Sequence, residues 1–250
     1  RNHSSAASDV YKRQGHGTHV AGTIAASSNN SIGVAGVSWN ARIMAVRFIG
    51  PEGWGYLSDA IAAIEYAAMM DVKITNNSWG GGGYYQSLYD AISDAELSGM
   101  LFIAAAGNAS SDNDASPSYP ASYELNNIIS VAATTDDDTL SSFSNYGQTS
   151  VDLGAPGSSI LSTYPGGYAY LSGTSMASPH VAGAVALLWG EYPNESAEQI
   201  QERILNSLDP LPTLQGKVLT GGRLNVDRAL SYQLPAPSIV VPAVRGPTYV

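Results

Sequence analysis

One serine of this chain stands where a nucleophile could work. Ser175 follows a Gly-Thr turn and opens an apolar run of small residues, in the stretch S-G-T-S-M-A-S-P-H-V-A-G-A at residues 172–184. The run predicts a buried helix, and the unpaired N–H groups and partial positive charge at a helix N-terminus would stabilise an oxyanion beside Ser175. The commonest role of a serine before an apolar run is to cap the helix. The position of Ser175 therefore allows catalysis without proving it.

The elements that must hold Ser175 alternate between short apolar strands and amphipathic helices. Such alternation predicts an α/β fold with a mainly parallel central sheet and helices on both faces. Ser58 is expected to cap one helix, and Ser196 to open another through a capping box with Gln199. The expected strands are 42–49, 73–78, 100–106, 128–134, 151–153 and 222–225, and the expected helices are 17–26, 59–70, 87–97, the run after Ser175, 197–206 and 226–232.

Composition excludes several classes of function. The chain has 250 residues, which suits one large domain, and 11 Lys+Arg against 21 Asp+Glu give it a net charge of -10. Because there is no basic patch, nucleic acid is not an expected partner. The absence of cysteine excludes disulfides, a thiol nucleophile and Cys-ligated zinc. No apolar run reaches the length of a membrane span.

The chain divides into three parts by pattern. Residues 1–14 show no apolar periodicity and meet Gly15 abruptly, so we interpret them as a non-native or disordered arm. Residues 15–232 are expected to form the domain. Residues 233–250 contain four prolines and are interpreted as a linker-like tail.

Three blocks, in this order, resemble the motifs of the subtilase family, the subtilisin-like serine peptidases. They are G-H-G-T-H-V-A-G at 15–22, A-A-A-G-N at 104–108 and S-G-T-S-M-A-S-P-H-V-A-G at 172–183, with N-N-S-W-G-G at 76–81 between them. The resemblance runs from Gly15 to about Tyr232. It implies the subtilisin-like three-layer architecture and a serine endopeptidase.

The resemblance also implies a role for one residue of each block. Ser175 would attack the scissile carbonyl, and His16 would take its proton and pass it to the leaving amine. Asn108 resembles the family's oxyanion-hole residue. It follows an expected strand end and a glycine, so it would project from the carboxyl edge of the sheet, where open α/β sheets bind ligands.

Substrate-binding residues carry over at two places. Ser78, Trp79, Gly80 and Gly81 resemble the family's edge segment, along which an extended peptide pairs as an added strand. Ala104, Ala105, Ala106 and Gly107 would form the opposite wall of the specificity pocket. Their small side chains leave room for a side chain of the substrate.

Two further histidines are expected to be structural. His19 lies one helical turn after His16, and this spacing could suit a metal, but no third ligand is evident and the family keeps this residue for packing. His180 lies one and a half turns along the helix of Ser175 and is expected to point away from it.

Calcium is the cofactor that the resemblance implies. The loop at 27–34 resembles the family's calcium loop, in which the Asn30 side chain and the carbonyls of Ser28, Ile32 and Val34 would be ligands. Other ligands of that site come from N-terminal segments that do not match here. Asp112, Asn113 and Asp114, or the run at 136–138, could offer a second site, although short acidic runs are usually solvated turns. By family habit we also expect a secreted monomer, an upstream propeptide, no organic cofactor and a polypeptide substrate.

The family's orienting aspartate has no counterpart in the sequence. Asp9 is the only acidic residue before His16 and stands too close to occupy a neighbouring strand end. We therefore expect the natural polypeptide to begin further upstream, with a signal peptide, a propeptide and a first strand that carries the aspartate. The chain as given is then expected to be inactive or nearly so.

Two other classes of function remain open. An α/β-hydrolase esterase is disfavoured, because G-T-S-M-A at 173–177 is not G-x-S-x-G and the histidine of that family follows its serine. A non-enzymatic peptide-binding module derived from a peptidase is consistent with the missing aspartate.

Overall fold

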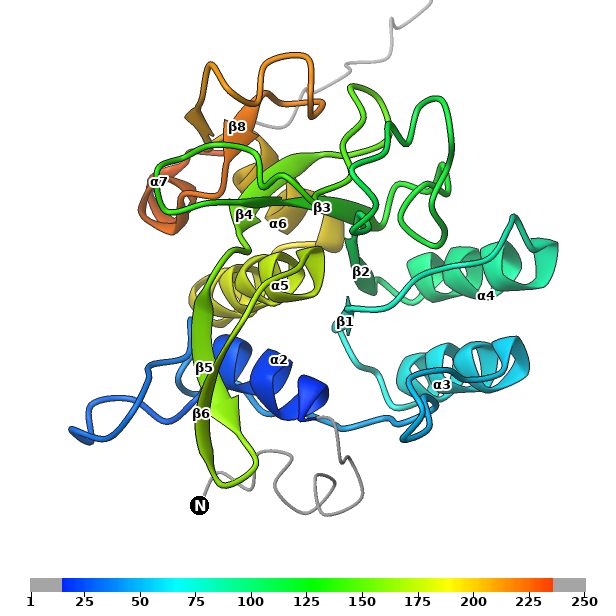
Figure 1. Cartoon of the computed structure of the whole chain (residues 1–250), viewed down its shortest axis with the longest axis horizontal. Helices are drawn as coiled ribbons and strands as arrows, with labels where there is room; N and C mark the ends of the chain where they lie inside the picture. The colour runs from blue at the N-terminus through cyan, green and yellow to red at the C-terminus, as the bar shows by residue number, and fades with distance from the viewer. Residues whose placement is uncertain (1–14, 236–250) are drawn as a thin grey trace, which may run out of the picture.

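The computed structural model describes residues 15–235, and its centre is a six-stranded sheet (Figure 1). In spatial order the strands are β1 (Ile74–Asn77), β2 (Leu101–Ala105), β3 (Ile128–Thr134), β4 (Leu153–Pro156), β8 (Gly222–Arg223) and β7 (Asp209–Pro210). The pairs β1–β2, β2–β3, β3–β4 and β4–β8 are parallel, and β7 pairs antiparallel with β8 at the edge of the sheet. Because parallel strands end at one edge of a sheet, the residues that follow β1 and β2 lie next to each other.

Helices cover both faces of this sheet (Figure 1). One face carries α3 (Leu57–Met69) and α4 (Gln86–Leu97), and the other carries α5 (Thr174–Glu191), α6 (Ala197–Leu205) and α7 (Val226–Ser231), with α2 (His16–Ala25) packed on α5. Successive residues of a strand face opposite sides. Leu101 and Ile103 of β2 accordingly join the core under α5, whereas Phe102 and Ala104 join the core under α3 and α4.

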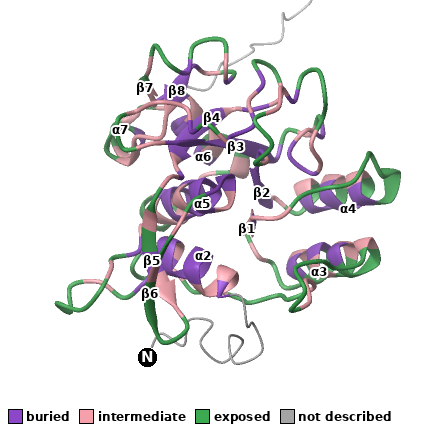
Figure 2. Ribbon diagram, in the orientation of Figure 1, coloured by how far each residue is buried: buried purple, intermediate pink, exposed green. Residues whose placement is uncertain are grey.

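The strands between these helices are the most deeply buried part of the molecule (Figure 2). Every residue of β2 and β3 is buried. The mainly parallel sheet with helices on both faces confirms the predicted fold class. None of the helices within residues 15–235 is long and apolar enough to cross a membrane.

Most of the expected elements are present, with ends shifted by a few residues. The capping box of α6 is confirmed: the Ser196 hydroxyl accepts from the Gln199 backbone, and the Gln199 side chain accepts from the Ser196 backbone. The expected cap at Ser58 is wrong, since Ser58 is the second residue of α3 and the N-cap position is held by Tyr56. In the domain division, residues 1–14 and 236–250 lie outside the described part of the chain.

The strand expected at 42–49 is wrong. This segment forms no strand, and Met44 and Val46 are each 38% exposed. A cavity of about 350 Å³ separates residues 41–49 from β1. An apolar run forms a strand only where a neighbour can take its backbone hydrogen bonds, and within the described residues nothing fills that place.

A β-hairpin beside α2 was not expected. β5 (Ile160–Tyr164) and β6 (Gly167–Leu171) pair antiparallel, and the Ser162 hydroxyl donates to the carbonyl of His19 at 2.7 Å. The signal in the sequence is the Pro165-Gly166 turn between two runs rich in Tyr and Leu.

Replacing Asp152 by asparagine should stabilise the fold in a pH-dependent way. Burial raises the pKa of Asp152 to about 6, although the Ser130 N–H, 2.7 Å from its Oδ2, favours the charged form. A carboxyl group whose pKa is raised by folding lowers stability as the pH rises from about 4 to 6. We expect Asp152→Asn to raise the free energy of unfolding by about 2 to 3 kcal/mol at pH 8, measured by urea unfolding.

The pH dependence of the gain in Asp152→Asn shows whether the gain comes from the ionisation of Asp152 or from a change in packing. The gain should vanish below pH 4, where the carboxyl group is neutral in both states. A gain of equal size at pH 4 and pH 8 would rule out the ionisation of Asp152 as its cause.

Candidate active site

Ser175 lies at the carboxyl edge of the sheet, in the first turn of α5. Its hydroxyl donates to the carbonyl of Ser78, just beyond the end of β1, at 3.3 Å. In return, the Ser78 hydroxyl donates to the carbonyl of Ser175 at 2.8 Å and lies 2.9 Å from the Ser178 hydroxyl. The N-cap position of α5 is held by Gly173, so Ser175 does not cap the helix. Among residues 15–235, the half-buried Ser175 hydroxyl donates one long hydrogen bond, to the carbonyl of Ser78.

Thr174 orients the side chain of Asn108. The backbone N–H of Thr174 donates to Asn108 Oδ1 at 2.8 Å, and the Thr174 hydroxyl donates to the same oxygen at 3.0 Å. The N–H of Gly107 donates to that hydroxyl at 3.1 Å. Since Oδ1 accepts both bonds, the Nδ2 group of Asn108 is the part that can donate to an oxyanion. Sequence reasoning missed Thr174, although a hydroxyl next to Ser175 at a helix start was visible.

His16 is the first residue of α2 and lines the same cavity as Ser78 and Trp79. Gly15 before it has a φ of +66°, and a Cβ there would lie 2.3 Å from the Tyr164 ring. The hairpin thus packs where only glycine fits and sets where α2 begins. His16 thus lines the same cavity as Ser78, and the carbonyl of Ser78 accepts the Ser175 hydroxyl.

The two expected walls of the substrate groove extend from adjacent strands. Asn77, the last residue of β1, pairs with Ala104 of β2, so the segment at 78–81 runs beside residues 105–107. Gly80 and Gly81 are exposed, and the N–H of Gly81 donates to the carbonyl of Tyr119 at 3.0 Å.

Not all residues of these walls can reach a substrate. Ala104 and Ala106 are 0% exposed and belong to the core, whereas Ala105 is 7% exposed and Gly107 is half-buried. The indole N–H of Trp79 donates to Asn77 Oδ1 at 3.1 Å, which turns this side chain back toward β1. The surface beside Ser175 is therefore formed mainly by Ser78, the glycines and Gly107.

His19 and His180, the other two histidines within residues 15–235, are embedded in the packing of α2, α5 and the hairpin. Nε2 of His19 lies 2.8 Å from the carbonyl of Ile160 and 3.1 Å from that of Ala169, and burial lowers the pKa of the His19 ring. Nδ1 of His180 lies 2.8 Å from the carbonyl of Met176, and burial lowers the pKa of His180 too. These contacts fit packing roles for both residues.

The four expected calcium ligands lie together in the loop at 27–34. Asn30 Oδ1 accepts the N–H of Ile32 at 3.0 Å, and its Nδ2 donates to the carbonyl of Ser27 at 3.3 Å. The loop contains no carboxylate, so it offers only neutral oxygens, and one of the expected ligands, Asn30 Oδ1, is engaged within the loop. By themselves these residues do not fit a calcium site. Within residues 15–235 there is also no cluster of three or more His, Asp or Glu that could hold a metal.

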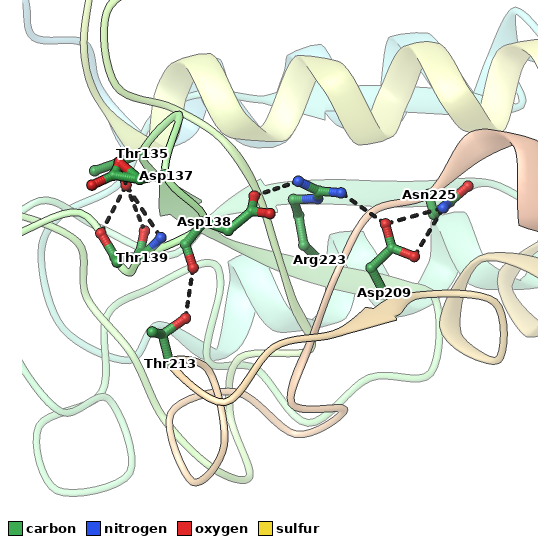
Figure 3. A network of polar contacts seen from close by, with 8 residues as sticks. All are labelled: Thr135, Asp137, Asp138, Thr139, Asp209, Thr213, Arg223 and Asn225. Atoms are coloured by element: carbon green, nitrogen blue, oxygen red, sulfur yellow. Dashed lines mark hydrogen bonds and ion pairs between the residues drawn. The ribbon is translucent and has the colours of Figure 1, made fainter.

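The acidic runs hold loops together. Asp114 accepts from the backbone and hydroxyl groups of Thr149 and Ser150, and these bonds outweigh burial and lower its pKa. Figure 3 shows the second run: Asp138 pairs with the Arg223 guanidinium, which also binds Asp209 at 2.7 Å. Asp209 in turn accepts from Asn225 at 2.9 Å. This network ties the 135–139 loop to β8 and β7.

The fold and these contacts define an α/β protein with a hydroxyl-centred site at the carboxyl edge of its parallel sheet. A model of the subtilase family, Peptidase S8, matches residues 1–231, and the chain belongs to this family. It is 45% identical over 219 residues to a thermophilic serine proteinase of Bacillus sp. strain AK1, covering 87% of this chain and 52% of that protein. It is 44% identical to thermitase of Thermoactinomyces vulgaris, over 87% of this chain and 75% of thermitase.

A third relative has a similar level of identity. Subtilisin BL of Lederbergia lenta is 44% identical over 198 residues, which cover 79% of this chain and 71% of that protein. The chain thus spans from about half to three quarters of the length of these relatives. The family predicted from the three sequence blocks is confirmed.

Proposed function

We propose that this protein is a serine endopeptidase in which Ser175 is the nucleophile. The observation that carries the proposal is the orientation of Asn108. Thr174, the residue before Ser175, holds Asn108 Oδ1 at 2.8 Å and so leaves an N–H donor beside the start of α5. The names of the relatives, a serine proteinase and subtilisins among them, support the same reaction.

The proposed reaction proceeds through an acyl-enzyme. The Ser175 oxygen attacks the scissile carbonyl carbon while the His16 ring takes the hydroxyl proton. Charge develops on the carbonyl oxygen, where the Ser175 backbone N–H and Asn108 Nδ2 donate to it. The tetrahedral intermediate collapses, the C–N bond breaks, and His16 gives its proton to the leaving amine. Water then hydrolyses the acyl-enzyme by the same steps.

The substrate lies along residues 78–81 in this proposal. An extended peptide would pair with the backbone of this glycine-rich segment as an added strand. The substrate side chain before the scissile bond would enter the space between this segment and residues 105–107. Because Ala104 and Ala106 are buried, we assign them to the support of that wall rather than to contact with the substrate.

We place the carboxylate that orients His16 outside residues 15–235. The cavity between residues 41–49 and β1 is also lined by His16. Among the described residues that line it there is no Asp or Glu. An extended segment in this cavity would lie beside β1 and could bring a carboxylate to the carboxyl edge. Loss of that carboxylate lowers turnover by about 3 × 10⁴ in such a triad, so residues 15–235 alone should be slow.

We extend the proposal to four further properties that are typical of the family: secretion, a monomeric state, a propeptide that helps folding, and calcium binding. Calcium would bind the loop at 27–34 only if oxygen ligands from outside that loop complete the site, because the loop itself supplies neutral oxygens.

A fluorophosphonate probe tests the proposed function directly. Attack by the Ser175 oxygen on phosphorus expels fluoride and leaves a stable phosphonate ester, which intact mass and peptide mapping locate. We expect a single adduct, on Ser175. In parallel, a peptide p-nitroanilide and p-nitrophenyl acetate are compared as substrates, and hydrolysis of the ester alone would favour an esterase.

The rival to be separated is a peptide-binding module without catalysis. The exposed glycines at 80–81 are as consistent with the binding module as with the peptidase, because their backbone can bind an extended peptide whether or not Ser175 reacts. No adduct after long incubation, together with binding of a peptide measured by fluorescence anisotropy, would support the binding module and contradict the peptidase.

A further inference from the structure

Two buried side-chain amides lie behind the turn that carries Asn108. Asn113 is 1% exposed and Asn145 is 3% exposed, and the two bind each other through Asn145 Nδ2 and Asn113 Oδ1 at 2.9 Å. Asn113 lies on the loop after β2, and Asn145 lies between β3 and β4. Buried amides without partners are costly, so each bond that this pair makes is under strong energetic constraint.

Asn145 binds the chain on both sides of Asn108. Its Oδ1 accepts the N–H of Ala109 at 2.8 Å and that of Ser111 at 3.2 Å, which hold the residues after Asn108. Its backbone N–H donates to the carbonyl of Gly107, the residue before Asn108, at 2.9 Å. The turn is thus held from residue 107 to residue 111 by one asparagine.

Asn113 closes the arrangement from the strand side. Its Nδ2 donates to the carbonyl of Ala106 at 2.9 Å, one residue after the end of β2. The fit is tight at Gly107, where a Cβ would lie 2.4 Å from Asn145 Nδ2 and the φ is +117°. The backbone therefore has no room to shift toward the pair.

We propose that Asn113 and Asn145 are positioning residues for the oxyanion-binding amide of Asn108. Thr174 holds the tip of the Asn108 side chain, and the asparagine pair holds its backbone on both sides. An oxyanion donor works only within a few tenths of an ångström of its proper distance. Thr174 and the asparagine pair together fix the position of Asn108 Nδ2. This inference rests on the proposed function of Asn108.

The bonds of the pair suggest variants that each remove one donor and little volume. In Asn145→Asp the acceptor for Ala109 and Ser111 remains, but the donor to Asn113 Oδ1 is replaced by a carboxylate oxygen that repels it, which should displace the turn. In Asn113→Asp the acceptor for Asn145 remains, but the donor to Ala106 is lost. If the charge of the new aspartate prevents folding, Asn113→Ser is used in place of Asn113→Asp, because it also loses the amide donor but stays neutral. Thermal unfolding of each variant reports on folding.

The test is a double-mutant cycle on the rate of phosphonylation of Ser175. The saturating rate constant and the probe concentration at half saturation are measured for the full chain and for each variant, with and without Asn108→Ala. We expect Asn145→Asp to lower the saturating rate constant by about tenfold to a hundredfold and to leave half saturation unchanged. In the Asn108→Ala background the same change should cost less than about twofold, because the amide that it positions is gone.

Two results would overturn the inference. One is an equal loss in both backgrounds, which shows that the pair acts on the fold or on another group. The other is a crystal structure of Asn145→Asp in which the Asn108 side chain and its bond to Thr174 have not moved. The crystal structure can be determined whether or not Ser175 reacts with the probe. If the unaltered chain takes no label, the proposed function fails, and the position of Asn108 in the variant still decides the positioning role.

Discussion

Ser175→Ala is expected to abolish the fluorophosphonate adduct and any amidase activity of the chain. In a complete triad, removing the nucleophile or the histidine costs about 10⁶ in turnover, more than removing any other single residue of the triad. The fold should survive, because within the described part of the chain the hydroxyl makes one weak bond, of 3.3 Å to Ser78, and does not cap α5. Intact mass after exposure to the probe, with circular dichroism of the variant, measures both parts of this prediction.

Ser172 provides the matched control. It is exposed, precedes α5, and accepts the N–H of Ser159 at 2.9 Å, away from the contacts between Ser175 and Ser78. Ser172→Ala should label at the rate of the unaltered chain. An adduct that persists in Ser175→Ala would assign the reactivity to another hydroxyl and would remove the basis of the proposed mechanism.

Arg203→Ala is expected to lower the free energy of unfolding by about 3 to 5 kcal/mol. Arg203 is 5% exposed, and its guanidinium donates to both carboxylate oxygens of Glu195, at 2.6 and 2.7 Å. It also donates to the carbonyl of Tyr232 and lies 3.6 Å from the centre of the Tyr192 ring. Its removal leaves Glu195 without its partner in a side chain that is only 16% exposed. Urea unfolding followed by circular dichroism gives the change in free energy.

An exposed ion pair serves as the comparison. The side chains of Lys73 and Asp71 pair at 2.7 Å, but they are 50% and 79% exposed. Lys73→Ala should therefore cost at most about 1 kcal/mol. The double variant of Arg203→Leu with Glu195→Leu should cost less than Arg203→Ala, because no charge is left buried. Equal losses in Arg203→Ala and Lys73→Ala would contradict the assignment of Arg203 as a buried anchor of α6.

Local pattern was enough for the elements whose stability depends on their own residues. The strand at 128–134 is predicted to the residue, because it is mostly apolar and every residue in it is buried. The capping box of α6 is confirmed because both of its bonds lie within four consecutive residues. The glycines and small residues around Ser175 likewise indicated a tightly packed helix, and Gly183 of α5 would clash with Val37 if it carried a Cβ.

The errors occur where an element depends on a distant partner. The run at 42–49 has the apolar side chains of a strand, but the described structure has a cavity at the place of its neighbour. The sequence also left open whether the acidic runs at 112–114 and 136–138 bind a metal or form solvated turns. Their partners, Thr149, Ser150 and Arg223, come from far along the chain and use them as ties between loops.

The sequence by itself determined the family, the α/β architecture and the identity of Ser175, His16 and Asn108 as the candidate residues, since these are carried by contiguous motifs. Only the tertiary structure decided how the Asn108 amide is oriented and what holds it there. That depends on Thr174, Asn113 and Asn145, which reach the turn from separate segments. Hydrogen bonds have direction, and a motif specifies which groups are present but not where their partners lie.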